Sequence, residues 1–268
     1  MTPASRDLAA ESLLAFWAEA GVDAMLLDAP FDRIAAGAIQ PPRPLERLAP
    51  PVRASVAAGH DISAAVAQAQ SKAGAAKDLA ALAAAIEAFD LCPLKTAGAA
   101  RQSVFYRGAP DAPLMVIGEA PGQEEDIAGA PFVGRAGQML DKMLAAAGLT
   151  DRVFITNSVF WRPPGNRNPT PEEQAVCAPF LERAVALLRP RMLLLVGGPS
   201  AKALLKRDEG ILSLRGRWFE WTSTDGSLEL PAMPTLHPAF LLRQPAAKKK
   251  AWSDLLTLTE RLDRPERP

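Results

Sequence analysis

From residue 111 onward, short apolar runs alternate with amphipathic helix patterns, and this alternation limits the possible folds more than any other feature of the chain. The first run, PLMVIG (113–118), ends at a glycine, as buried parallel strands often do. Further runs with strand character are RVFITNSV (152–159), RMLLLVGG (191–198), RWFEW (217–221) and LELPAMPT (228–235). The alternation predicts an α/β fold of three layers, in which helices cover both faces of a central, mainly parallel sheet of four to five strands.

The helix patterns between these runs carry their own start signals. In TPEEQAVCAPFLERAVALLR (170–189), Thr170 is a good N-cap, Pro171 fits the first helical position, and two glutamates fill the first turn. Other helices are predicted at 137–148, 199–207 and 246–262. Ligands bind to such sheets at the carboxyl ends of the strands. We therefore expect the loops that follow strand ends to form one site: 118–137, 157–170 and 236–245.

The N-terminal part of the chain has a different composition. An amphipathic helix pattern near the N-terminus is followed by the proline-rich stretch AIQPPRPLERLAPPVR (38–53), which predicts an extended linker. Residues 61–89 are rich in alanine, and DLAALAAAIEAF predicts a helix that docks on the main domain. We expect residues 1–75 to form a helical and proline-rich extension, and residues 76–268 to form the domain that carries the site.

Charge and cysteine content exclude several classes of protein. Lysine plus arginine and aspartate plus glutamate each number 30, so a nucleic-acid partner would have to meet a local positive charge. Two cysteines cannot build a disulfide framework, and no apolar run reaches the about 20 residues of a membrane-spanning helix. We expect a cytoplasmic monomer without a membrane partner.

The loop 118–137 is rich in both glycine and acidic residues. Its glycines let the backbone approach a flat ligand closely, and by themselves they would also suit a phosphate. Its carboxylates would repel a phosphate, however, and neither common phosphate-binding glycine motif is present. The loop therefore favours a neutral heterocycle, on which Phe132 could stack, although Phe132 could equally be a core residue.

Asn157 and His237 each follow a strand and could supply the polar groups of this site. The amide of Asn157 can donate to a pyrimidine O4 and accept from N3–H at the same time, a pair that matches uracil and mismatches cytosine. A single asparagine more often caps a turn. His237 precedes a rigid proline at a strand end, which places it better for chemistry than His60, which we interpret as structural.

Basic residues accompany the second and third loops. Arg162 and Arg167, in RPPGNRNPTPEE, would suit either a DNA backbone or a protein surface. Arg243 and Lys248 belong to a local basic patch, although any single lysine could equally lie on a solvated helix face. Beside this patch, Leu241 and Leu242 could insert between stacked bases.

Five segments of the chain resemble, in this order and spacing, the family 4 uracil-DNA glycosylases, which are known for carrying an iron–sulfur cluster. The segments are GEAPGQEED, GAPFVGRAG, ITNSV, RPPGNRNPTPEE and LHPAFLLR, and the resemblance runs from about Phe89 to Trp252. It implies the uracil-DNA glycosylase fold. It also implies removal of uracil from single- or double-stranded DNA by hydrolysis of the N-glycosidic bond, which leaves an abasic site.

The resemblance also implies roles for single residues. Phe132 would stack on the flipped uracil, Asn157 would read its Watson–Crick edge, and His237 would stabilise charge on uracil O2. Glu119 would lie beside the glycosidic bond and the attacking water, and Arg243 with its basic neighbours would hold phosphates. Further base-binding positions of the motif are Gly118, Ala120 and Glu125.

The chain departs from the family pattern at the cluster. The family uses four cysteines, of which Cys92 and Cys177 match two, whereas Phe89 and Trp161 occupy the other two positions. Two thiolates cannot hold a four-cysteine cluster. We therefore expect no iron–sulfur cluster, no other cofactor and no metal site, with apolar packing in place of the cluster and two buried thiols.

The three loops contain no lysine, so we expect water to be the nucleophile and the DNA strand to stay intact. Which group activates the water stays open, because Ala120 stands where better-understood relatives carry an aspartate. Three alternatives also stay open. Relatives that trap uracil-DNA covalently through a histidine carry an inserted loop rich in arginine and histidine after the second strand, and the absence of any histidine from WRPPGNRNPTPEE argues against this alternative. Retained Glu119, Asn157 and His237 disfavour a reader without turnover, and the acidic loop disfavours a nucleotide-phosphate enzyme.

Overall fold

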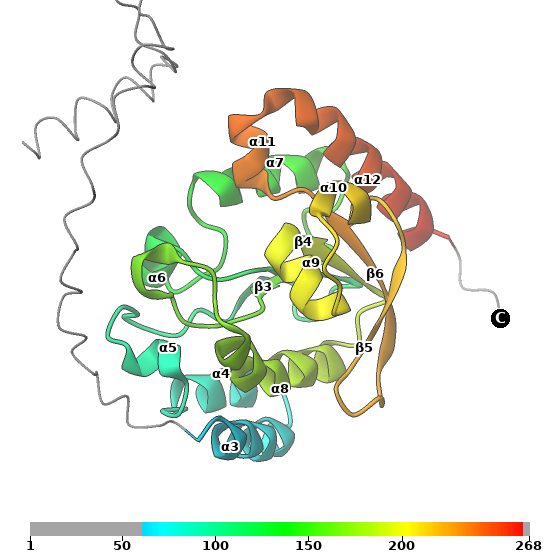
Figure 1. Cartoon of the computed structure of the whole chain (residues 1–268). Coiled ribbons are helices and arrows are strands. Elements are labelled where there is room, and N and C mark those ends of the chain that lie inside the picture. Colours follow the sequence, from blue (N-terminus) through cyan, green and yellow to red (C-terminus); the bar gives the residue numbers. More distant parts are fainter. Residues whose placement is uncertain (1–60, 265–268) are drawn as a thin grey trace, which may run out of the picture. The chain divides into compact units, whose positions relative to one another are not determined.

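The computed structural model describes residues 61–264, in which a six-stranded sheet lies between helices (Figure 1). The strands are β1 (Tyr106–Gly108), β2 (Leu114–Gly118), β3 (Val153–Asn157), β4 (Met192–Val196), β5 (Phe219–Thr222) and β6 (Glu229–Thr235). Their order is β1-β3-β2-β4-β6-β5; the four inner strands run parallel and the two edge strands antiparallel. The predicted α/β class with a mainly parallel sheet is confirmed.

The sheet has one strand more than the sequence predicted. The extra strand, β1, has three residues, and its sequence YRG shows neither an apolar run nor alternation. Its ladder with β3 is extended at both ends, because Val104 N–H donates to the Phe160 carbonyl (2.7 Å) and Ala109 N–H to the Val153 carbonyl (2.9 Å). Pairing with an existing edge, more than local propensity, therefore forms this strand.

Helices cover both faces of the sheet and complete the three layers. They are α3 (Ile62–Ala75), α4 (Leu79–Glu87), α5 (Pro93–Thr96), α6 (Gln123–Ala128), α7 (Arg135–Ala146), α8 (Pro171–Leu188), α9 (Gly198–Leu205), α10 (Ile211–Leu214), α11 (Pro238–Arg243) and α12 (Lys248–Leu262). In β2, Leu114 and Val116 join a hydrophobic cluster with α7 and α12, whereas Met115 and Ile117 join another with α4 and α8. The alternation of side chains along the strand thus supplies a core to each face.

Helix α8 begins as its sequence predicted. Thr170 is the N-cap, and its hydroxyl accepts a hydrogen bond from Glu173 N–H (3.3 Å). In return, the Glu173 carboxylate accepts one from Thr170 N–H (2.8 Å), which completes a capping box. This box fixes where the loop that follows β3 becomes a helix, and Glu173 also contacts that loop through Arg167.

The alanine-rich helix α3 packs against α8. Its buried face consists of Ala65, Ala69 and Ala73, whose small side chains let the two helices approach closely. Arg183 of α8 donates two hydrogen bonds to the Ala76 carbonyl at the end of α3 (3.0 and 2.6 Å). The division at residue 75 stays a prediction, and the expected N-terminal helix and the linker 38–53 lie outside the described residues. Within the described range, no helix is long and apolar enough to cross a membrane.

Candidate base-binding pocket

A pocket of about 730 Å³ lies at the carboxyl ends of β2, β3 and β6, where the three predicted loops meet. It contains most of the predicted site residues: Glu119, Ala120, Glu125, Phe132, Asn157, Arg167, His237 and Arg243. Gly118, Arg162, Leu241 and Lys248 do not line it. The sequence therefore located the pocket correctly, while the role of each residue must be argued from its contacts.

Gly118 sits behind the pocket and lets its two main walls come together. It pairs with Asn157 in the register of β2 and β3. A Cβ atom at Gly118 would lie 2.4 Å from Asn157 Oδ1 and 2.4 Å from Phe132 Cζ, which no side chain tolerates. Gly118 thus supports the base-binding residues by leaving space for them.

Phe132 occupies a strained backbone position that its surroundings hold in place. Its φ of 55° lies in the left-handed region, which a bulky residue seldom adopts. Arg107 donates to the carbonyls of Pro131 (2.8 Å) and Phe132 (3.1 Å) and pairs with Asp141 (2.6 Å). Arg107 carries no recognisable motif and lies on the unpredicted strand β1, so its role could not be predicted from the sequence.

Asn157 and two aromatic rings form the centre of the pocket. The Phe132 and His237 rings lie 5.9 Å apart between centroids and are tilted by 31°. Asn157 is almost fully buried, yet within the described chain its side-chain amide makes no hydrogen bond to the protein. Asn157 lines the pocket, so its amide can bond to a ligand there. The pocket therefore offers a donor and acceptor pair beside an aromatic ring.

His237 is held in one orientation as the N-cap of α11. Its Nδ1 accepts a hydrogen bond from Ala239 N–H (3.1 Å), so in the neutral ring the hydrogen is on Nε2. Burial, followed by the positive charge of Arg243, lowers the pKa of His237 to about 4. Near neutral pH the residue is therefore an uncharged imidazole that can donate through Nε2.

Glu119 follows Gly118 and carries an unusual carboxyl group. Burial raises the pKa of Glu119 above its ordinary value, and its Oε1 is buried without a hydrogen-bond partner in the described structure. Its backbone is fixed, because Ser158 Oγ donates to the Glu119 carbonyl (2.7 Å). A partly desolvated carboxylate of this kind suits proton transfer or stabilisation of a cation.

Glu125 holds the shape of the loop. Its carboxylate accepts hydrogen bonds from three backbone amides, those of Gly122 (3.1 Å), Val133 (3.1 Å) and Gly134 (3.0 Å). These bonds join the two ends of the segment that carries Phe132. Glu125 also lines the pocket, and its direct contact with a base stays a prediction.

The predicted DNA-contacting residues surround the pocket unevenly. Arg167 and Arg243 line it, whereas Arg162 lies outside it and bonds to Asn166 Oδ1 (2.7 Å). Lys248 is exposed at the start of α12. Leu241 was predicted to insert into the base stack, but it is fully buried in the core that includes α7 and α12, so this prediction is wrong. For Leu242, which is 39% exposed, insertion into the base stack stays a prediction.

The two cysteines lie in a buried part of the core, close enough to the Glu173 carboxylate to feel its charge. Cys92 and Cys177 are fully buried, with their sulfurs 4.0 Å apart. Phe89 and Trp161 are buried with them, and the Phe89 ring packs edge-on against Phe180 at 5.2 Å. Burial raises the pKa of Cys177 well above its ordinary value, so at neutral pH it is a thiol. Two thiols among aromatic rings do not fit a four-cysteine cluster.

Comparison with known proteins agrees with this geometry. The model of the uracil DNA glycosylase superfamily matches residues 105–256, which include all six strands and the pocket. A type-4 uracil-DNA glycosylase of Pyrobaculum aerophilum is 39% identical over 171 residues, which are 62% of this chain and 85% of the relative. One of Saccharolobus solfataricus is 38% identical over 168 residues (60% and 77%). A type-5 enzyme of Thermus thermophilus is 34% identical over 114 residues (37% and 52%).

Proposed function

Because the chain belongs to the uracil-DNA glycosylase superfamily, we propose that it hydrolyses the N-glycosidic bond of deoxyuridine in DNA and releases uracil. The observation that carries this proposal is the side chain of Asn157, whose amide makes no hydrogen bond within the described chain and lines one pocket with Phe132 and His237. Its NH₂ group would donate to uracil O4, and its oxygen would accept from N3–H. Cytosine presents the opposite pattern of donors and acceptors, which this orientation of the amide does not match.

The target base is stacked within DNA, so the nucleotide must be flipped into the pocket at a cost of a few kcal/mol. Stacking on Phe132 and the two hydrogen bonds to Asn157 offset part of this cost. Because the loop is fixed by Arg107 and Glu125, the ring of Phe132 is in place before the base arrives. The pocket is then preorganised for a flat, neutral ring.

Negative charge develops on uracil O2 as the glycosidic bond breaks. His237, neutral because of its lowered pKa, would donate from Nε2 to that oxygen. The sugar gains positive charge at the same time, and the Glu119 carboxylate would stabilise it or accept a proton from the attacking water. Among the described residues that line the pocket none is a lysine, so water is the nucleophile and the strand is not cut.

The proposed reaction needs no cofactor. Phe89 and Trp161 occupy two of the four positions at which the family places cluster ligands, and both are buried in the core. We therefore propose that this member of the family has no iron–sulfur cluster. Iron analysis of the purified protein tests the point, since an iron content near four atoms per chain would contradict it.

The function is tested with a labelled oligonucleotide that contains one uracil, followed by alkali. Turnover that gives alkali-labile sites supports the glycosylase. A matched oligonucleotide with thymine in place of the uracil should stay intact. Asn157→Ala should lower turnover by orders of magnitude, whereas Gln138→Ala, which removes an exposed amide on α7 outside the pocket, should leave it unchanged. Binding without release would instead indicate a reader, and an adduct that survives denaturant would indicate a covalent trap.

A further inference from the structure

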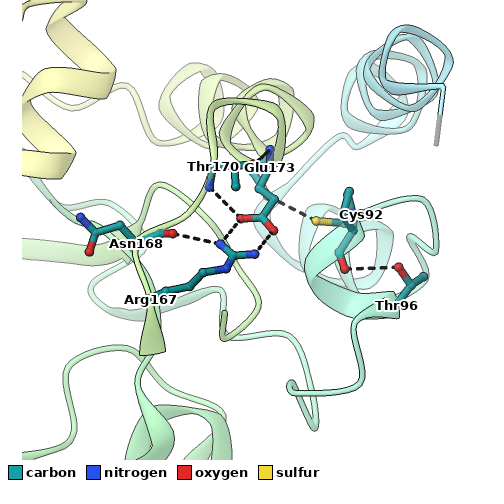
Figure 2. Close-up of polar contacts among 8 residues, drawn as sticks. Cys92, Thr96, Arg167, Asn168, Thr170 and Glu173 are labelled. Carbon is teal, nitrogen blue, oxygen red and sulfur yellow. Dashed lines mark hydrogen bonds and ion pairs between the residues drawn. The ribbon is translucent and has the colours of Figure 1, made fainter. Parts of the chain in front are cut away.

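Arg167, on one wall of the pocket, is held by a buried carboxylate from the start of α8 (Figure 2). Its Nη2 donates to Glu173 Oε1 (2.5 Å) and its Nη1 to Glu173 Oε2 (2.8 Å), so the guanidinium group and the carboxylate form a bidentate ion pair. Nη1 also donates to the Asn168 carbonyl (2.9 Å). Glu173 is only 4% exposed and is itself fixed by the capping box with Thr170.

The hydrogen bonds of Arg167 leave one edge of its guanidinium group without a partner. The group has five N–H donors. Both hydrogens of Nη1 and one of Nη2 are used by Glu173 and Asn168. The remaining donors, Nε–H and the second hydrogen of Nη2, point the same way along one edge, and within the described residues nothing accepts from them. The Arg167 side chain is 43% exposed and lines the pocket.

We propose that this free edge of Arg167 binds one phosphate of the DNA strand that enters the pocket, and that Glu173 is the positioning residue that aims it. An arginine edge with two parallel N–H donors matches the two oxygens of a phosphate. Glu173 balances the charge of Arg167, so the contact depends on two directed hydrogen bonds more than on net charge. This inference rests on the proposed function, because it requires DNA in the pocket.

Directed bonds and simple charge attraction predict different results for Arg167→Lys. Lysine keeps the positive charge and can still pair with Glu173, but it has no planar edge with two donors. If charge alone mattered, the substitution would be nearly silent. If the edge binds a phosphate, the substitution removes the recognition of that one phosphate and leaves the other contacts of the DNA unchanged.

The experiment replaces the phosphates around the uracil, one at a time, with uncharged methylphosphonates. For the wild-type protein, kcat/KM should fall about tenfold at one position, as expected for a lost hydrogen bond to a charged group. In Arg167→Lys the same replacement should cost less than about twofold, since the contact is already gone. If each methylphosphonate lowered kcat/KM by the same factor in Arg167→Lys as in the wild type, the proposal would be overturned.

Glu173→Gln tests the positioning role. Although Arg167 is still present in this variant, replacing the same phosphate should lower kcat/KM by less than it does in the wild type. Relative to the wild type, the variant's own loss of kcat/KM should come mostly from a higher KM. Full coupling in a folded Glu173→Gln protein would refute the role of Glu173. If that variant does not fold, Glu173→Asp, whose side chain is one carbon shorter, replaces it.

The matched control is Arg264→Lys, at an exposed arginine paired with Glu260, and it should behave as the wild type does. Failure of the wild-type protein to release uracil at all would instead refute the proposed function.

Discussion

Gly118 and Asn157 are neighbours in the register of β2 and β3, and a Cβ atom on the glycine would lie 2.4 Å from Oδ1 of the asparagine. The same atom would lie 2.4 Å from the Phe132 ring. The end of β2 is therefore shaped to let an amide and an aromatic ring approach each other. Substitutions there should affect the pocket before they affect the rest of the fold.

Gly118→Ala should lower uracil release by at least about a hundredfold and reduce the free energy of unfolding by about 1–3 kcal/mol, because the added methyl displaces Asn157 and Phe132. Single-turnover rates and urea denaturation measure the two effects. Gly210→Ala is the matched control, since a Cβ there meets nothing within 4 Å and the backbone conformation is ordinary. Equal effects of both variants would contradict this account.

His237 should make the stability of the protein depend on pH in a specific range. Its pKa is lowered to about 4 in the folded state, whereas the unfolded value is about 6.5. Between these values the unfolded chain binds more protons, so the contribution of His237 is complete above pH 6.5 and is lost as the pH falls toward 4. Urea denaturation at pH 4.5 and 7 should show this loss in the wild type, and His237→Gln should show less of it.

Glu119→Gln should stabilise the protein at neutral pH while lowering kcat. The folded state raises the pKa of Glu119, so the charged carboxylate destabilises the fold above the ordinary pKa of glutamate. Water screens part of this effect because Glu119 is only partly buried, so we expect a gain of no more than roughly 1 kcal/mol. Denaturation at pH 7 and pH 4 checks the sign, since the gain should shrink at pH 4. Unchanged kcat would argue against a role in the reaction.

Arg107→Lys should weaken the support of the Phe132 loop. Lysine can keep the ion pair with Asp141, but it cannot also bond to the Pro131 and Phe132 carbonyls with the same geometry. We expect kcat/KM to fall by about tenfold, because a small displacement of the stacking ring weakens base binding. Steady-state kinetics measures the change in kcat/KM. Arg152→Lys, in the arginine–aspartate pair Arg152–Asp263, serves as the control. A loss no larger than that of the control would contradict the supporting role.

The sequence predicted the parts of the fold that local patterns determine. The five longer strands, the start of α8 and the meeting of three loops all follow from apolar runs and capping residues. Strand β1 was missed, because three residues carry no pattern and their pairing with β3 creates the strand. Arg107 was missed for the same reason, since its partners Pro131, Phe132 and Asp141 lie 24, 25 and 34 residues further along the chain.

Side-chain orientation was harder to predict than position. Leu241 and Leu242 are adjacent and equally apolar, so only the packing of α11 decides that the first is buried and the second is 39% exposed. Likewise, Glu125 and Glu173 look like ordinary charged residues at helix starts. Their roles appear only when the backbone amides and the arginine that they bind come near in space.

The packing of Phe89 and Trp161 bears on how the protein matures in the cell. Their rings complete this part of the core with atoms that the chain itself supplies. If the protein carries no cluster, as proposed above, its folding would need no delivery of iron and sulfide. Synthesis during iron starvation or oxidative stress should therefore yield a fully folded repair protein, under the conditions in which DNA damage accumulates and metal centres are hardest to build.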